Sequence, residues 1–249
     1  MFAIPYLGRT LVGTTDTPIE KVSLEPLPMV EEIAFILETA GTYLEKVPTE
    51  KDILSIFTGI RPLVRAGDGM NTAALARDHT IHISNSGLVT IAGGKWTTYR
   101  QMAEDCLEHA LALTDLEIKP CVTKELNVHG FHKTAEKFGA FSLYGADAPE
   151  LMDLLRADPA LKEPLHPDLP ACAGEVVWAV RHEAARTVDD FLARRTRSLL
   201  LNARAAREAA PRVAHLMAGE LKKDASWEKS QIEAFFEISE AYLPHLSSA

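Results

Sequence analysis

Three positively charged side chains stand where a protein could hold an anion: Arg61, Arg77 and Lys95. Arg61 directly precedes a proline, which restricts its backbone to extended geometry and so fixes the direction of its guanidinium. Lys95 follows two glycines. Guanidinium and ammonium groups are favourable partners of carboxylate and phosphate. These residues predict a site for an anionic ligand, with a surface salt bridge at Arg61 and a solvated lysine at Lys95 as the plain alternatives.

The segment from Leu88 to Arg100 predicts how the backbone contributes to that site. Residues 88–92 are apolar and β-branched and indicate a strand, which ends at Gly93 and Gly94. The following apolar residues fall on one face of a helix: Tyr99, Met102, Ala103, Cys106, Leu107 and Ala110. A helix that begins after glycines exposes free N–H groups with partial positive charge, and glycines let a ligand approach the backbone. The turn therefore favours an anionic atom.

A predicted hairpin connects Arg77 with the same turn. Residues 80–83 and 88–92 have strand character, and the sequence Asn-Ser-Gly between them is typical of a tight turn. In an antiparallel pair, the start of one strand faces the end of the other. We therefore expect Arg77 and the glycine turn at the same end of the hairpin. Arg61 follows a further predicted strand, residues 52–59.

The rest of the pattern divides into a mixed first part and an all-helical second part. The first part is predicted to contain a hairpin of residues 2–7 and 10–14, and a helix over 28–44. Four helices are predicted in the second part, over 148–157, 174–197, 203–221 and 226–242. The fold class is therefore α+β, with a sheet-and-helix lobe over 1–120, a connector over 121–147 and an α-helical domain over 148–249. Because the chain opens inside a hairpin, we expect it to be a piece of a larger protein.

Composition excludes several other classes of protein. The formal net charge of −9 argues against nucleic-acid binding, because contact with phosphates needs a basic face. The three cysteines, Cys106, Cys121 and Cys172, lack metal-ligand spacing and are expected to be reduced thiols, so we propose no metal site. The sequence shows no signal-peptide pattern and no run of about 20 apolar residues that a membrane helix would need.

Several phrases of the sequence occur together, in this order, in one protein family. They are Gly13-Thr14-Thr15-Asp16, Thr58 to Leu63, Ala76 to His79, Gly93 to Arg100, and Val180 to Arg197. The ordered set resembles the C-terminal half of FAD-dependent glycerol-3-phosphate dehydrogenase, the respiratory type that reduces quinone. The resemblance covers nearly the whole chain. It implies an antiparallel or mixed-sheet substrate lobe of a glycine-oxidase-like flavoprotein, present in part, followed by an all-α C-terminal cap domain.

The resemblance also implies a reaction and a limit on what this chain does alone. The full-length enzyme oxidises sn-glycerol 3-phosphate to dihydroxyacetone phosphate, moves hydride from C2 to the flavin and passes electrons to quinone. Members of the family hold the pyrophosphate of FAD with a Gly-x-Gly-x-x-Gly fingerprint. The present sequence contains no such fingerprint. We therefore expect this polypeptide alone to hold FAD poorly and to be inactive.

Roles for individual residues follow from the same resemblance. Arg61 would be catalytic, polarising the oxygen that becomes a carbonyl, and Arg77 would hold the substrate phosphate. Lys95 would lie between that phosphate and the pyrimidine edge of the flavin. Backbone N–H groups at the turn would stabilise negative charge on reduced flavin. The predicted cofactor contacts are Gly93, Gly94, Lys95, Trp96 and Thr97.

Two other functions remain open from the sequence. Glycerophosphate oxidase would share the site but pass electrons to oxygen. A non-catalytic helical interaction module would explain the missing fingerprint, whereas the three basic residues favour an enzymatic origin. By resemblance, the protein is expected in the cytoplasm, with peripheral association at the cytoplasmic face of the inner membrane.

Overall fold

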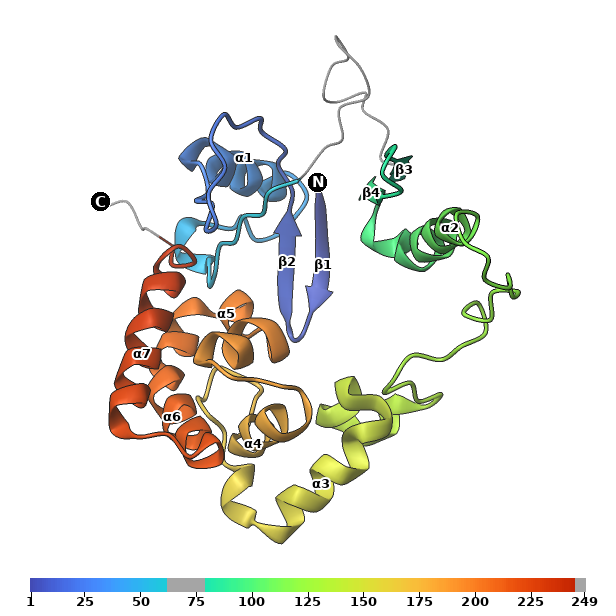
Figure 1. The fold of residues 1–249 in the computed structure, drawn as a ribbon. Helices are drawn as coiled ribbons and strands as arrows, with labels where there is room; N and C mark the ends of the chain where they lie inside the picture. The colour runs from blue at the N-terminus through green and yellow to red at the C-terminus, as the bar shows by residue number, and fades with distance from the viewer. Residues whose placement is uncertain (62–78, 245–249) are drawn as a thin grey trace. The chain divides into compact units, whose positions relative to one another are not determined.

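The structure, a computed structural model, describes residues 1–61 and 79–244, and its contacts form two compact units. The larger unit comprises Met1–Gly59 together with His132–Ala249, and the smaller unit comprises Ile60–Phe131. About half of the chain is helical, and the strands form two small antiparallel sheets (Figure 1). The α+β class is thus confirmed, while the proposed division at residues 120 and 147 stays a prediction.

The larger unit begins with the predicted hairpin. Strands β1 (Phe2–Tyr6) and β2 (Arg9–Gly13) pair antiparallel, with Phe2 opposite Gly13. Both residues of the connecting turn, Leu7 and Gly8, have positive φ, as the tightest hairpin turns require. Helix α1 (Val30–Gly41) follows and is shorter at both ends than the predicted 28–44. Two glutamates in its first turn complement the helix dipole.

The strand predicted over residues 52–59 is wrong. A single 3₁₀ turn, η1 (Glu50–Asp52), is followed by backbone that belongs to neither sheet. The apolar pattern correctly indicated extended backbone at Ile53, but it could not indicate the bonding partners. The backbone groups of Leu54 and Ile56 bond instead to Ala203 and Tyr242, more than 140 positions away.

Residues 132–244 form the helical part of the larger unit. Its elements are η4 (Ala135–Asp147), α3 (Ala148–Ala157), η5 (Pro159–Lys162), α4 (Ala173–His182), η6 (Asp190–Arg195), α5 (Ser198–Leu201), α6 (Ala203–Leu221) and α7 (Ala225–Glu240). The predicted bounds of α3 and α6 are confirmed, and α7 differs from its prediction by one residue at its start and two at its end.

The single long helix predicted over 174–197 is wrong, because the chain breaks after α4. Ala184 has a φ of 53°, in the left-handed region. The carboxylate of Asp190 then accepts hydrogen bonds from the backbone N–H groups of Arg186 and Thr187, at 2.9 and 3.0 Å. A side chain that bonds nearby backbone competes with helix continuation. The chain resumes as η6, a short π-helical segment.

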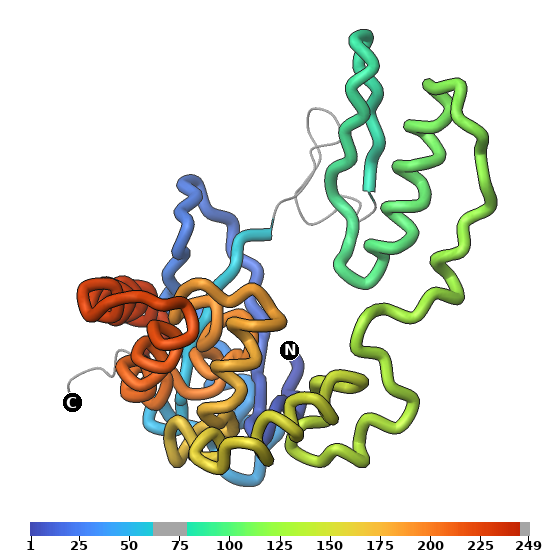
Figure 2. Tube along the Cα trace, turned by 60° about the horizontal axis from the view of Figure 1, so that its bottom comes forward, coloured from blue at the N-terminus to red at the C-terminus, as the bar shows by residue number. Residues whose placement is uncertain are grey.

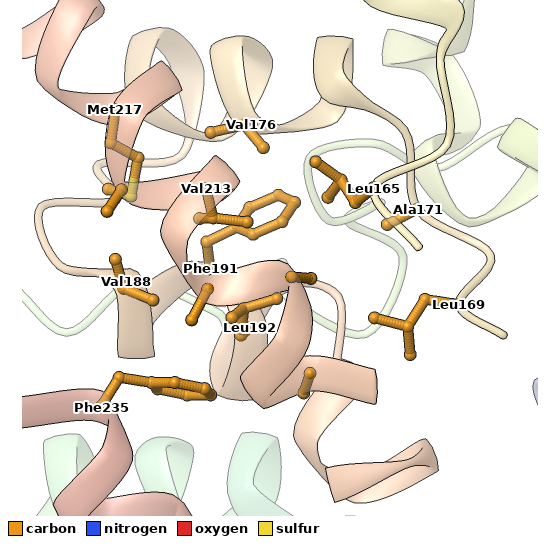
Figure 3. Close-up of a cluster of buried hydrophobic side chains, with 14 of the residues drawn as sticks. Leu165, Leu169, Ala171, Val176, Val188, Phe191, Leu192, Val213, Met217 and Phe235 are labelled. Atoms are coloured by element: carbon orange, nitrogen blue, oxygen red, sulfur yellow. The ribbon is translucent and has the colours of Figure 1, made fainter. Parts of the chain in front are cut away.

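The main core of the larger unit lies between α4, η6, α6 and α7. Phe191, Val213 and Met217 are completely buried and are drawn together in Figure 3, with Phe235 of α7 beside them. Helix α6 faces this core with alanines, which let neighbouring helices approach closely: Ala205, Ala206, Ala209, Ala210 and Ala214. Burial of this apolar surface is the main stabilising term for the helical part.

A polar contact fastens the η4–α3 region to helix α4. The phenol of Tyr144 donates to Oε1 of Glu175 at 2.9 Å, and the N–H of Cys172 donates to Oε2 of the same carboxylate at 2.7 Å. The ring of Tyr144 also packs edge-on against Trp178. Burial raises the pKa of Glu175 and the pKa of Tyr144.

Candidate functional site

The predicted site lies in the smaller unit, which is built from one hairpin and one helix. Strands β3 (His79–Ile83) and β4 (Val89–Gly93) pair antiparallel, and helix α2 (Tyr99–Leu111) packs against both (Figure 2). His79 pairs with Gly93, so the start of β3 faces the end of β4, as predicted. The turn at Gly87 has positive φ, which confirms the predicted tight hairpin.

The two glycines at the end of β4 are favoured by backbone conformation, and Gly94 is favoured by space as well. Gly93 and Gly94 have φ of 80° and 83°, a region that side chains other than hydrogen rarely allow. A Cβ at Gly94 would overlap the thioether of Met102 and lie 3.3 Å from Cβ of His79. The chain therefore reverses tightly between the hairpin and α2, with its backbone close to the helix that follows.

The helix begins with a 3₁₀ turn, η3 (Trp96–Thr98), that leads directly into α2. The N–H of Thr98 donates to the carbonyl of Lys95 at 3.0 Å, and the N–H of Lys95 lies 3.4 Å from the hydroxyl of Thr98. Among the described residues, the N–H groups of Trp96 and Thr97 have no hydrogen-bond acceptor. The strand–glycine–helix transition is confirmed, and beside an exposed lysine it presents two N–H donors that have no acceptor within the described part of the chain.

Two sets of polar side-chain contacts hold the parts of this unit together. Nε2 of His79 lies 2.9 Å from Oδ2 of Asp105, so the first residue of β3 is tied to the middle of α2. Nη1 of Arg100 lies 2.6 Å from Oε2 of Glu104 and donates to the hydroxyl of Thr123 at 3.2 Å. The hydrogen bond from Arg100 lowers the pKa of Glu104. Nothing in the sequence indicated this role for His79, although His79 ends one of the phrases that carry the family resemblance.

The structure brings five of the predicted site residues onto one turn: Gly93, Gly94, Lys95, Trp96 and Thr97. The indole of Trp96 is 86% exposed and stacks on Tyr99 with ring centroids 5.5 Å apart. Arg61 is exposed and belongs to the same compact unit. Arg77 lies outside the described residues, two positions before His79. The ligand contacts assigned to these residues stay predictions.

The described residues show neither a metal-binding cluster nor a membrane-spanning helix. They contain no group of three or more His, Cys, Asp or Glu side chains placed to hold a metal ion. Over the same residues, no helix combines the length and the apolar character needed to cross a bilayer.

The structure shows a strand–glycine–helix turn in one unit and a helical part in the other, and comparisons with known proteins identify the family to which this combination belongs. The model of the family described as "C-terminal domain of alpha-glycerophosphate oxidase" matches residues 89–229. That range contains the whole candidate turn, Gly93 to Thr97, and most of the helical part. The chain belongs to this family, which confirms the resemblance inferred from the ordered phrases.

Individual relatives agree with this assignment. The mitochondrial glycerol-3-phosphate dehydrogenase SDP6 of Arabidopsis thaliana is 34% identical over 97% of this chain, and the human mitochondrial glycerol-3-phosphate dehydrogenase is 36% identical over 94%. The crystal structure of the glycerol-3-phosphate dehydrogenase from Bacillus halodurans in complex with FAD matches 99% of this chain with a TM-score of 0.77 and 25% identity. The chain spans only 43%, 35% and 52% of these three proteins, respectively.

Proposed function

We propose that this chain supplies the substrate side and one flavin-facing turn of an FAD-dependent enzyme. The enzyme oxidises sn-glycerol 3-phosphate to dihydroxyacetone phosphate and passes the electrons to quinone. The observation that carries the proposal is the turn from Gly93 to Thr97, whose open N–H groups and exposed lysine lie inside the matched family domain. The FAD-bound relative from Bacillus halodurans supports the identity of the cofactor.

The residues at the turn fit a flavin. The N–H groups of Trp96 and Thr97 and the ammonium of Lys95 form a donor set that suits the oxygen-bearing, electron-rich edge of a flavin ring. Gly93 and Gly94 keep the backbone free of side chains at the point of approach. When bound, FAD would supply a hydride acceptor for C2 of the substrate.

The chain's own residues would then bind and polarise the substrate. Arg61 would donate hydrogen bonds to the C2 oxygen as it changes from hydroxyl to carbonyl, and Arg77 would pair with the phosphate. Lys95 would add positive charge between the substrate phosphate and the flavin. The hydroxyl proton passes to a base that we do not assign to this chain. The hydrogen on C2 of the substrate would leave as hydride, so the substrate would lose two electrons and two hydrogens in total.

The test combines this chain with an FAD-binding half, which we would take from the Bacillus halodurans relative. Visible flavin absorbance reports assembly, and the 249-residue chain alone is expected to be colourless. Adding glycerol 3-phosphate without oxygen should bleach an assembled yellow protein, while glycerol at the same concentration should not. A yellow protein that glycerol 3-phosphate does not bleach would contradict the proposal and favour a non-catalytic role for the helical part.

Arg61 provides the most direct test of the chemistry. Arg61→Ala is expected to lower kcat/KM by about 2–4 kcal/mol of transition-state stabilisation, because the developing negative charge loses its donor. Arg156→Ala is a matched control, since Arg156 pairs with Asp153 on the exposed surface of α3. An unchanged rate for Arg61→Ala, with flavin still bound, would remove Arg61 from the proposed chemistry.

A second candidate function is oxidation with oxygen as the acceptor, which the description of the matched family names. Reoxidation of the reduced, assembled protein separates the two functions. Rapid reoxidation by a soluble quinone and slow reoxidation by air supports the dehydrogenase, and the reverse order supports the oxidase. We further propose that the assembled enzyme acts at the cytoplasmic face of the inner membrane as a peripheral protein. Co-sedimentation with anionic lipid vesicles tests this.

A further inference from the structure

We propose that His79 is a positioning residue for the flavin-facing turn, Gly93 to Thr97, and that it acts through Asp105. The contact between these two side chains fixes the direction of helix α2 against the hairpin. It thereby sets how the open N–H groups of Trp96 and Thr97, just before α2, meet a bound flavin. The inference rests on the proposed function, because it takes the turn to face flavin.

The contact is directional and partly shielded from water. Nε2 of His79 lies 2.9 Å from Oδ2 of Asp105, and the two side chains are 20% and 27% exposed. The other carboxylate oxygen, Oδ1, accepts a hydrogen bond from Nε2 of Gln101 at 2.6 Å. Gln101 lies four residues earlier on α2, so it holds the carboxylate on the helix surface. The carboxylate therefore meets the imidazole in a fixed orientation, as the acceptor of an N–H donor.

The contact closes a ring of chain around the turn, all of it within the smaller unit. His79 pairs with Gly93, so the first residue of β3 lies beside the last residue of β4. The chain then passes through η3, where the N–H of Thr98 donates to the carbonyl of Lys95, and continues unbroken along α2. From the middle of α2, Asp105 reaches back to His79. Each link of this ring is a described contact or a continuous element.

Apolar packing alone would not give the turn its direction. Met102 lies on the same face of α2 as Asp105, three residues earlier, and its thioether lies against Gly94. A methionine side chain is flexible, and apolar contact is non-directional. Such packing keeps α2 close to the hairpin but leaves its tilt open. The hydrogen bond at His79 removes this freedom, because its strength depends on geometry.

A positioning role and a merely stabilising role predict different effects on flavin. Loss of a stabilising contact weakens the smaller unit and affects both oxidation states of the flavin alike. Misdirected N–H groups act selectively, because they interact most strongly with the negative charge that reduced flavin carries. The ratio of the affinities for reduced and oxidised flavin, measured as the midpoint potential, separates the two roles.

The first measurement is amide hydrogen exchange over residues 79–111 in the 249-residue chain. His79→Phe keeps a ring but removes the donor, and His79→Gln restores an N–H donor. His82→Phe is the matched control, since His82 is exposed on the same strand. His79→Phe should raise exchange at residues 98–102, the start of α2, and leave the strand pair protected. Unaltered exchange, or equal loss of protection over the whole unit, would overturn the positioning role.

The second measurement is a redox titration of the flavoprotein assembled with the FAD-binding half. His79→Phe should weaken binding of reduced relative to oxidised flavin about tenfold, which lowers the two-electron midpoint potential by about 30 mV. His79→Gln should recover most of this shift, and His82→Phe should show none. An unchanged potential in His79→Phe, with flavin fully bound, would overturn the inference.

A double-mutant cycle tests the route through Asp105. In an Asp105→Ala background, His79→Phe should shift the potential much less, because the contact is already absent. Equal shifts in both backgrounds would overturn this route. The titration uses a chemical reductant and redox dyes, so it does not depend on glycerol 3-phosphate. A failure of substrate to bleach the unaltered protein would instead contradict the proposed function, so the two failures are distinguishable.

Discussion

Replacing Gly94 with alanine tests whether the turn between β4 and α2 is as constrained as its geometry indicates. Gly94 has a φ of 83°, and its missing Cβ would point into the thioether of Met102. The substitution adds only one methyl group and leaves the charge unchanged. Its effect on stability therefore reports the backbone conformation and the local packing of the turn.

The size of the effect follows from two separate costs. An alanine held at positive φ costs about 1–2 kcal/mol. The atoms that an extra carbon would overlap are the flexible end of the Met102 side chain, so the packing cost lies near the lower end of the usual range, at about 1 kcal/mol. Gly87 separates the two costs, because it has the same φ of 83° but no atom near its missing Cβ. We therefore expect Gly87→Ala to destabilise the smaller unit by about 1–2 kcal/mol and Gly94→Ala by about 2–3 kcal/mol.

The assay is amide hydrogen exchange over residues 79–111 as a function of urea, which follows the smaller unit separately from the larger one. Adding Met102→Ala to Gly94→Ala should recover the packing cost and leave the conformational cost, and the Met102→Ala single variant completes the cycle. Equal destabilisation by Gly94→Ala and Gly87→Ala, with no coupling between Gly94 and Met102, would refute the reasoning.

Three further predictions concern other parts of the molecule. Burial raises the pKa of Glu175 above its ordinary value of 4.5. Its contribution to the free energy of unfolding is therefore complete below about pH 4.5 and is lost as pH rises through the folded-state pKa. Glu175→Gln should flatten this pH dependence in urea titrations, and an unchanged slope would contradict the prediction. Asn202→Ala should cost about 1 kcal/mol of unfolding free energy, because its side chain caps α6 at Ala205; Asn202→Asp should retain the stability, and equal loss in both would exclude a capping role. Lys95→Ala should weaken binding of a phosphate analogue by about 1.5–3 kcal/mol in isothermal titration of the assembled enzyme, and unaltered affinity would exclude contact with phosphate.

Both hairpins and the glycine turn could be predicted from the sequence because their determinants are local. Turn residues fix the register of the two-residue hairpin at Leu7 and Gly8, and Gly87 marks the turn of the longer second hairpin. Paired glycines mark a reversal that other residues resist. His79 opposite Gly93 follows from the register alone. The contact between the side chains of His79 and Asp105 could not be predicted, because it depends on how α2 lies against the hairpin.

The long helix predicted over 174–197 fails for a different reason. Its apolar spacing continues through the break after His182, so periodicity gives no warning. The helix ends because the carboxylate of Asp190 accepts hydrogen bonds from two backbone N–H groups that a continuous helix would have used. Asp190 is one of several acidic residues in that stretch, and only the structure shows which of them bonds to the preceding backbone.

Residues 54–56 show why a change in composition does not define an independent folding unit. Helices dominate the sequence from near residue 148 onward, yet Leu54 bonds to the first residue of α6, Ser55 bonds to α5, and Ile56 bonds to Tyr242, just after α7. Buried helix ends need partners, and nothing in their own sequence identifies the residues that provide them. Stability of the helical part therefore depends on hydrogen bonds to a segment more than 140 residues earlier in the chain.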